Sequence, residues 1–140
     1  MAFAGTNHLA IVTASAASFL FGGVWYGIFS KPWMQALGKS ETDLKSAGRS
    51  MPLLFSITII AQLIMAWVLA GLIGHLASGP VTIRTGLITA AFLWLGFVAT
   101  TLAVNHGYQG SRWSLTMIDG GHWLGVLLIQ GAVIGLIGAP

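Results

Sequence analysis

The sequence predicts an all-α membrane protein, a bundle of four transmembrane helices in up-down-up-down order with a short interfacial helical loop between the first two. Hydrophobic residues make up 56% of the 140 residues and charged residues only 6%, whereas a soluble domain carries about 25% charged residues. Four apolar segments reach the ~20 residues that cross a bilayer. Two of the links between them are short, which makes sequential helices antiparallel neighbours.

The expected helices belong to a single membrane domain that covers residues 1–140. The four spans lie at about 8–29, 53–77, 82–105 and 114–138. The N-terminal stretch has no Lys or Arg before the first apolar run, so it lacks the charged start of a signal peptide, and we expect the first span to be retained.

The one long link, residues 30–52, has the pattern of two short helices. Pro32 suits the first turn of a helix, and Gly38 can end it. Ser40 and Asp43 resemble the acidic form of a capping box, and Gly48 closes the second piece. We expect the apolar sides of both pieces at the membrane surface, with an ordinary ordered loop as the alternative for the second.

Basic residues lie mainly on one side of the predicted bundle. That side carries Lys31, Lys39, Lys45, Arg49 and Arg112, and the other carries Arg84. Positively charged loops stay in the cytoplasm. We therefore predict a multi-pass protein of the cell (inner) membrane, with loops 30–52 and 106–113 cytoplasmic and both termini outside. No basic stripe exists, so we expect no nucleic-acid partner.

Asp119 is the most informative residue, because it is a carboxylate within an apolar span. The chain has three acidic residues, and the other two lie in the long link. An acidic side chain at the centre of a membrane helix costs roughly 2.5–3.5 kcal/mol, and less near the interface. His122 follows at i+3 and shares its face.

The predicted topology gathers polar side chains where the first, third and fourth spans meet at the cytoplasmic side. The candidate polar site comprises Tyr26, Asn105, His106, Arg112, Asp119 and His122. Asp119 could be a structural carboxylate tied to Arg112, His106 or backbone donors, a proton-handling or binding group, or a neutral acid without a role. His and Asp are metal-ligand types, but the spacing is not diagnostic, and we expect no metal and no cofactor.

Three Trp residues lie deeper than the interfacial belt. Trp67, Trp94 and Trp123 are candidate contacts for an apolar ligand such as a quinone, a pigment or an acyl chain. Alternatively, each Trp faces lipid or donates its N–H to a partner. Ser15 and Gln62 could add to a thin polar seam, although such residues more often join helices by hydrogen bonds.

Glycine pairs spaced by four residues mark close helix contacts. They occur at Gly121 and Gly125, at Gly131 and Gly135, and at Gly23 and Gly27. Such pairs let backbones approach, either within the bundle or between subunits. We expect the lipid bilayer as one partner, and self-association or a larger membrane complex through these Gly-rich faces as the other.

The whole chain resembles the bacterial membrane family catalogued as domain of unknown function 1761. The pieces that carry the resemblance are Asn7-His8, Trp25-Tyr26, Lys31-Pro-Trp33-Met34, Glu41-Thr-Asp43-Leu44, Leu93-Trp94-Leu-Gly96 with Asn105, and Asp119-Gly-Gly121. The turn 107–112 departs from the family pattern, because it lacks the usual acidic residue. The resemblance implies a small four-span membrane protein with no established activity.

These observations favour a structural or accessory subunit of a homo-oligomer or larger membrane complex. One alternative is a small oligomeric transporter or proton-coupled carrier using Asp119 and His122, and a further alternative is a binder of a lipid, quinone or pigment. We do not expect an enzyme, because the chain has no Cys and no paired carboxylates or Ser-His-Asp arrangement.

Overall fold

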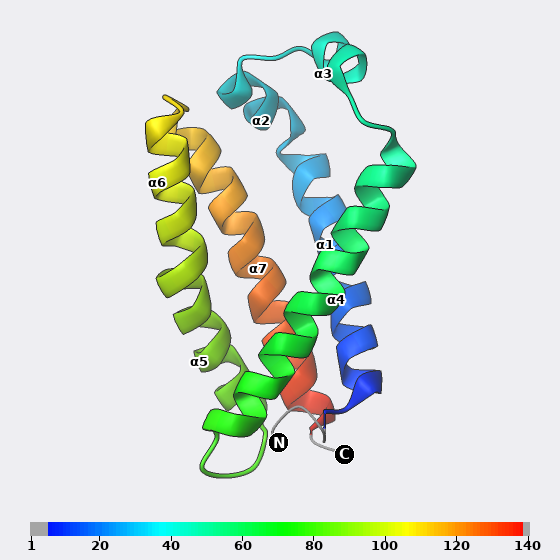
Figure 1. The fold of residues 1–140 in the computed structure, drawn as a ribbon, viewed down its shortest axis with the longest axis vertical. Helices are drawn as coiled ribbons and strands as arrows, with labels where there is room; N and C mark the ends of the chain where they lie inside the picture. Colours follow the sequence, from blue (N-terminus) through cyan, green and yellow to red (C-terminus); the bar gives the residue numbers. More distant parts are fainter. Residues whose placement is uncertain (1–5, 139–140) are drawn as a thin grey trace.

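Four long helices stand side by side in the computed structural model, which describes residues 6–138 (Figure 1). Each is long and apolar enough to cross a membrane: His8–Ile28, Met51–Leu76, Ile83–Tyr108 and Trp113–Ile137. The predicted four-helix architecture is therefore confirmed, with span ends within about three residues of those expected. The predicted domain 1–140 also includes residues 1–5 and 139–140, which lie outside the described residues.

The third span is the only one of the four that is divided. In chain order the elements are α1 (His8–Ile28), α2 (Ser30–Leu37), α3 (Glu41–Ala47), α4 (Met51–Leu76), α5 (Ile83–Leu93), the π-helix η1 (Trp94–Ala99), α6 (Thr100–Tyr108) and α7 (Trp113–Ile137). The elements α5, η1 and α6 follow one another without a break.

The bundle has two different ends (Figure 1). The loop end carries α2, α3 and the turn between α6 and α7, and the terminal end carries the start of α1, the end of α7 and the turn between α4 and α5. At the terminal end, the Asn7 side-chain amide donates to the Gly138 carbonyl at 3.4 Å. The same Asn7 caps α1 by accepting from the backbone N–H groups of Leu9 and Ala10.

The last helix, α7, is the central element of the bundle. It packs against α1, α2, α4, α5, η1 and α6. Its tightest contact is with α5, where a Cβ on either Gly86 or Gly131 would overlap the carbonyl of the other. Gly135 lies equally close to the backbone of Thr82. Glycine is required at these positions because the two backbones touch.

A cluster of polar side chains lies in the middle of the bundle. The Ser18 hydroxyl is 2.6 Å from Gln62 Oε1, and Gln130 Nε2 donates to Ser18 Oγ at 3.1 Å and to the Gln62 carbonyl at 3.2 Å. The Ser15 hydroxyl bonds to the Ile11 carbonyl and to the same Gln62 carbonyl. These bonds join α1, α4 and α7, as expected for polar residues that hold membrane helices together.

The two short helices of the long link form as the sequence predicts. Gly38 ends α2 in the left-handed conformation with φ 69°, which glycine adopts without strain. Ser40 and Asp43 form the capping box of α3. Trp33 of α2 packs edge-on against Tyr26, with ring centroids 5.7 Å apart. No residue of α3 is buried. Its location at the membrane surface stays a prediction.

The π-helix is the element that the sequence analysis missed. Hydroxyls of Thr100 and Thr101 donate to the carbonyls of Gly96 and Phe97, four residues earlier. Such side-chain bonds take up carbonyls in a widened turn, and π-turns often occur near functional sites. The first residue of η1, Trp94, donates its indole N–H to the Gly120 carbonyl at 2.8 Å. This bond joins the third span to α7 one residue after Asp119.

Candidate functional site

Asp119 lies between two aromatic side chains from other helices. Tyr26, near the end of α1, donates its hydroxyl to Asp119 Oδ1 at 2.7 Å. On the opposite side, His106 Nε2 of α6 is 3.9 Å from Asp119 Oδ2. The Asp119 side chain is 19% exposed and that of His106 is 12% exposed. Because Asp119 is six residues into α7, it lies roughly 9 Å below the helix start, where a charge is tolerated more easily than at the span centre.

The second ring nitrogen of His106, Nδ1, makes a hydrogen bond within the site. His106 Nδ1 is 2.9 Å from Thr116 Oγ1, one turn before Asp119 on α7. Asp119 therefore has a hydroxyl donor on one side and, 3.9 Å away on the other, the imidazole Nε2 of His106.

Two of the six predicted polar residues lie outside this cluster. Arg112 is the N-cap residue of α7 and is exposed, and the partners that the structure shows for Asp119 are Tyr26 and His106. Asn105 is also exposed, and its carbonyl accepts the capping N–H of Gln109 at the end of α6. The expected tie from Arg112 to Asp119 is thus replaced by a hydroxyl from α1.

His122 lies one turn below Asp119 and is 5% exposed. Its ring packs against Tyr26 at 4.8 Å and Trp123 at 4.7 Å between centroids. Nδ1 is buried without a hydrogen-bond partner. Nε2 faces Gly22 of α1, where an added Cβ would come within 2.8 Å of it. Gly22 therefore provides the space into which this imidazole edge points.

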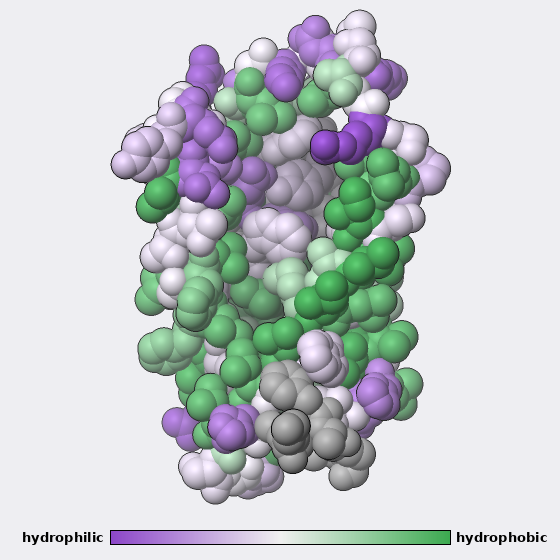
Figure 2. Space-filling model, in the orientation of Figure 1, coloured by the Kyte–Doolittle hydropathy of each residue, from purple (hydrophilic) through white to green (hydrophobic). Residues whose placement is uncertain are grey.

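His122 opens onto a pocket between α1, α4 and α7. The pocket has a volume of about 380 Å³, within the ~300–1,000 Å³ of small-molecule sites. It is lined by Phe19, Gly22, Gly23, Tyr26, Phe55, Thr58, Gln62, His122 and Trp123. In Figure 2 a hollow of pale side chains, in the half nearer the loop end, lies between a largely purple border on the left and a mainly green border on the right. The candidate site therefore combines this pocket with the Asp119 cluster, and Tyr26 belongs to both.

One wall of the pocket is loosely packed. The first half of α4 makes few contacts, and its apolar side chains are exposed, Phe55 to 50%. The other exposed members of this stretch are Met51, Leu53, Leu54, Ile57, Ile59 and Ile60. The pocket therefore borders an exposed apolar face of α4.

The three deep Trp residues have different surroundings. Trp123 lines the pocket beside His122. Trp94 is used in the bond to Gly120 and lines a separate pocket with Thr116 and Leu124. Trp67 on α4 is 44% exposed and lies outside the pocket lining. Of these three Trp residues, only Trp123 lies in the pocket beside His122.

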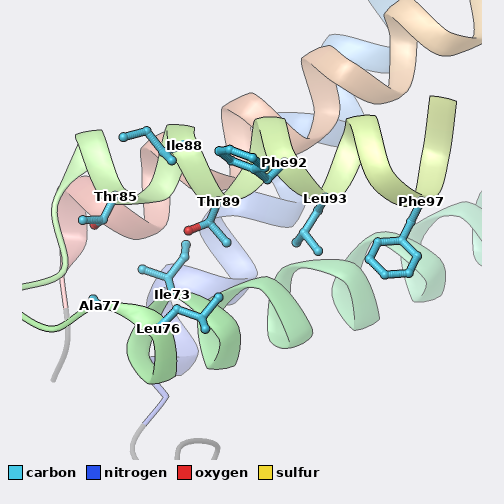
Figure 3. A pocket seen from close by; sticks show the side chains of 9 residues that line it. All are labelled: Ile73, Leu76, Ala77, Thr85, Ile88, Thr89, Phe92, Leu93 and Phe97. Atoms are coloured by element: carbon cyan, nitrogen blue, oxygen red, sulfur yellow. The ribbon is translucent and has the colours of Figure 1, made fainter. Parts of the chain in front are cut away.

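A groove between α4 and α5 offers a contrast in chemistry (Figure 3). Ile73 and Leu76 of α4 and Thr89 and Leu93 of α5 point into it. It has about the same volume, about 410 Å³, but its lining holds only hydroxyls as polar side-chain groups. Acyl chains of the surrounding lipid suffice to fill such a groove. The pocket at His122 differs because imidazole and amide groups face it.

The residues His106, Asp119 and His122 do not form a metal centre in the geometry seen. Among the residues described, no three His, Asp or Glu side chains lie close enough to hold a metal ion. Sequence reasoning missed Ser18 and Gln130 of the central cluster, and Phe55 and Thr58 of the pocket. The available signal was helical spacing, of Phe55 and Thr58 from Gln62, of Gln130 from His122, and of Ser18 from Ser15.

The fold and site define a small four-span helical membrane protein with a polar centre near one end and a pocket between α1, α4 and α7. The chain belongs to the family described as "Protein of unknown function (DUF1761)", which it matches over residues 9–135. This match confirms the resemblance found in the sequence. Comparison with curated proteins found no match, and neither did comparison with solved structures.

Proposed function

We propose that this protein binds a small lipid-phase molecule in the pocket between α1, α4 and α7. The observation that carries the proposal is the His122 imidazole, which is 95% buried by the bundle, lines the pocket and turns Nε2 toward Gly22 in the pocket wall. Nδ1 is enclosed by the bundle without a partner, so a ligand in the pocket meets the ring at Nε2. A small number of polar groups in a mostly apolar pocket is the arrangement that orients a bound small molecule.

Lateral access supports the same function. The pocket lies beside the exposed first half of α4, so a hydrophobic molecule can enter from the bilayer without crossing an aqueous phase. The aromatic side chains of Phe19, Tyr26 and Trp123 then provide flat apolar walls. This binding role requires no bond-making step, in keeping with our expectation that the protein is not an enzyme.

Two glycines of α1 give a matched test. Neither Gly23 nor Gly27 has any atom within 4 Å of an added Cβ, but only Gly23 lines the pocket. Gly23→Leu should fill the pocket and Gly27→Leu should not. We expect protein purified from native membranes, and the Gly27→Leu variant, to retain a small molecule that Gly23→Leu loses, measured by mass spectrometry of an organic extract. Equal retention by both variants, or no retained molecule in the unaltered protein, would contradict the proposal.

We also propose that the loop end faces the cytoplasm of a cell whose inner membrane holds the protein. Lys31, Lys39, Lys45, Arg49 and Arg112 support it, since all lie at the loop end, while Arg84 is at the terminal end. The chain has no Cys, so Ser46→Cys and Ser78→Cys give single probes at opposite ends. In intact cells a membrane-impermeant maleimide should label only the Ser78 variant; the reverse pattern would invert the topology.

The subunit and carrier interpretations remain predictions. The subunit interpretation relied on contacts between copies through Gly-rich helix faces. On α7 these glycines already contact Gly86, Thr82 and side chains of α1 within the bundle. Gly23 and Gly27 of α1 remain open for contact between copies. The carrier interpretation relied on Asp119 and His122, which the structure places one helical turn apart near Tyr26.

A further inference from the structure

The pocket presents two hydrogen-bond donors at its polar side, beside the hydroxyl oxygens of Thr58 and Tyr26, whose protons are used in bonds to Leu54 and Asp119. A neutral imidazole carries its proton on one of two nitrogens. Nδ1 of His122 is buried without a partner, and a bare nitrogen is less costly there than an unpaired N–H, because a buried donor almost always finds an acceptor. The favoured tautomer therefore carries the proton on Nε2, which faces Gly22 at the pocket wall.

Gln62 contributes the second donor. Its Oε1 accepts the Ser18 hydroxyl at 2.6 Å, which leaves the amide NH₂ as the free end of the side chain. Gln62 also lines the pocket. Gln130 donates to the same Ser18 hydroxyl, whose own proton has two acceptors, Gln62 Oε1 at 2.6 Å and the Ser15 carbonyl at 3.1 Å. The shorter contact favours the orientation in which Gln62 accepts. Imidazole and amide thus each offer N–H groups to one ligand.

The charges around the pocket select against anions. The pocket lining contains no Lys or Arg. The Asp119 carboxylate accepts a hydrogen bond from the pocket residue Tyr26, and His106 of α6 lies on the other side of Asp119. A carboxylate or phosphate headgroup would therefore be placed near a like charge without a fixed cation. Fatty acids and anionic phospholipids are disfavoured as occupants.

The walls favour a flat ring. Phe19, Phe55 and Trp123 line the pocket together with Tyr26, and aromatic side chains gain from offset or edge-on contact with another ring. Resting on the binding function proposed above, we infer that the ligand is a neutral ring with carbonyl oxygens and an apolar tail, of the quinone class. Its carbonyls accept from His122 Nε2 and from the Gln62 amide, and its tail leaves along α4 into lipid.

The experiment compares three probes that share one alkyl tail, a decyl-substituted benzoquinone, decylbenzene and 4-decylbenzoate. Each is titrated against the full chain in detergent, and bound protein is counted by native mass spectrometry. Two neutral hydrogen bonds stabilise binding enough for at least about a tenfold preference. We expect the quinone to bind about tenfold more tightly than decylbenzene, and 4-decylbenzoate to bind most weakly.

Two variants test whether His122 and Gln62 produce the preference for the quinone over decylbenzene. His122→Phe and Gln62→Leu should each reduce the preference for the quinone over decylbenzene by several-fold while decylbenzene still binds, which shows that the variant has folded. If a variant binds neither probe, the ranking of the three probes on the unaltered protein decides alone. Equal binding of quinone and decylbenzene, tighter binding of the benzoate, or an unchanged preference in folded variants would overturn the headgroup assignment and leave the proposed binding function standing. No binding of any probe would overturn both.

Discussion

The terminal and loop halves of this bundle are built on different principles. In the terminal half, α5 and α7 touch through the backbone at Gly86 and Gly131, and Gln130 closes a buried hydrogen-bond cluster with α1 and α4. In the loop half, α4 stands exposed, and aromatic rings and a pocket separate it from α7. The terminal half fixes the helices relative to one another, and the loop half keeps space for another molecule.

Glycine serves both halves of α7 in different ways. At Gly131 and Gly135 the missing side chain admits the backbone of α5. At Gly121 and Gly125 it admits the rings of Trp25 and Phe21 from α1. The first kind of contact is rigid because no side chain can move aside. The second can adjust, and it lies beside Asp119 and His122. The same four-residue spacing thus gives a backbone contact with α5 at one end of α7 and a contact with aromatic side chains of α1 at the other.

The largest expected effect comes from Gly86→Ala in the terminal half. The added methyl would overlap the Gly131 carbonyl, so α5 must move away from α7, and overpacking of this kind costs about 1–3 kcal/mol. Thermal unfolding in detergent, followed by circular dichroism, measures the loss. Gly74→Ala is the control, because nothing lies within 4 Å of its Cβ. An equal effect of the two substitutions would remove the distinction between the rigid and the open half.

An intermediate effect is expected in the loop half, from the bond between Tyr26 and Asp119. Tyr26→Phe removes the donor, and Asp119→Asn removes the charge on the acceptor. A hydrogen bond to a charged group contributes about 1.5–3 kcal/mol, reduced here because the carboxylate is partly exposed. A double-mutant cycle in unfolding free energy should give a coupling of about 1 kcal/mol. Additive effects would show that the two side chains act independently.

The smallest effect is expected at α3, outside the bundle. Hydrogen bonds from the backbone N–H and side chain of Ser40 lower the pKa of Asp43 below its ordinary value of 3.8. A lowered pKa in the folded form means that the capping box stabilises α3 fully above pH 3.8 and loses this contribution as the pH falls through the lowered pKa.

Amide hydrogen exchange, corrected for intrinsic rates, measures the effect at α3. Protection over 41–47 should fall between pH 6 and pH 2.5, and Asp43→Ala should remove this dependence. The helix α2 is the internal control, because its first turn holds no acidic residue and no side-chain cap. Loss of protection in both helices together would point to opening of the whole loop rather than to the Asp43 cap.

The helices could be predicted closely because their signals are local. Apolar length set the four spans, and the Ser40 and Asp43 pattern set α3. The π-helix could not be predicted, since its widened turn depends on hydroxyl bonds from Thr100 and Thr101 and on the contact of Trp94 with α7. Threonine in a membrane helix is common, and nothing in the local sequence distinguishes this turn.

The candidate site could be placed at the correct end but not resolved into partners. Topology alone brought Tyr26, His106, Asp119 and His122 together. It could not distinguish Tyr26 from Arg112 as the partner of Asp119, because the choice depends on how α1 is rotated against α7. That rotation is set by Gly22, Gly121 and Gly125, which determine how closely particular rings approach. Interhelical distance is a property of the pair, so a single helix does not reveal it.

The central place of α7 has a consequence for biogenesis. It is the last of the four spans to leave the ribosome, yet α1, α4 and α5 all pack on it. Until it inserts, the face of α5 around Gly86 lacks its partner Gly131, whereas α1 and α4 can already be joined through Ser18 and Gln62. The bundle is therefore complete only after the last span has been made. A translation arrest before Trp113 would leave α1 and α4 in contact and α5 without the helix that it packs against most closely.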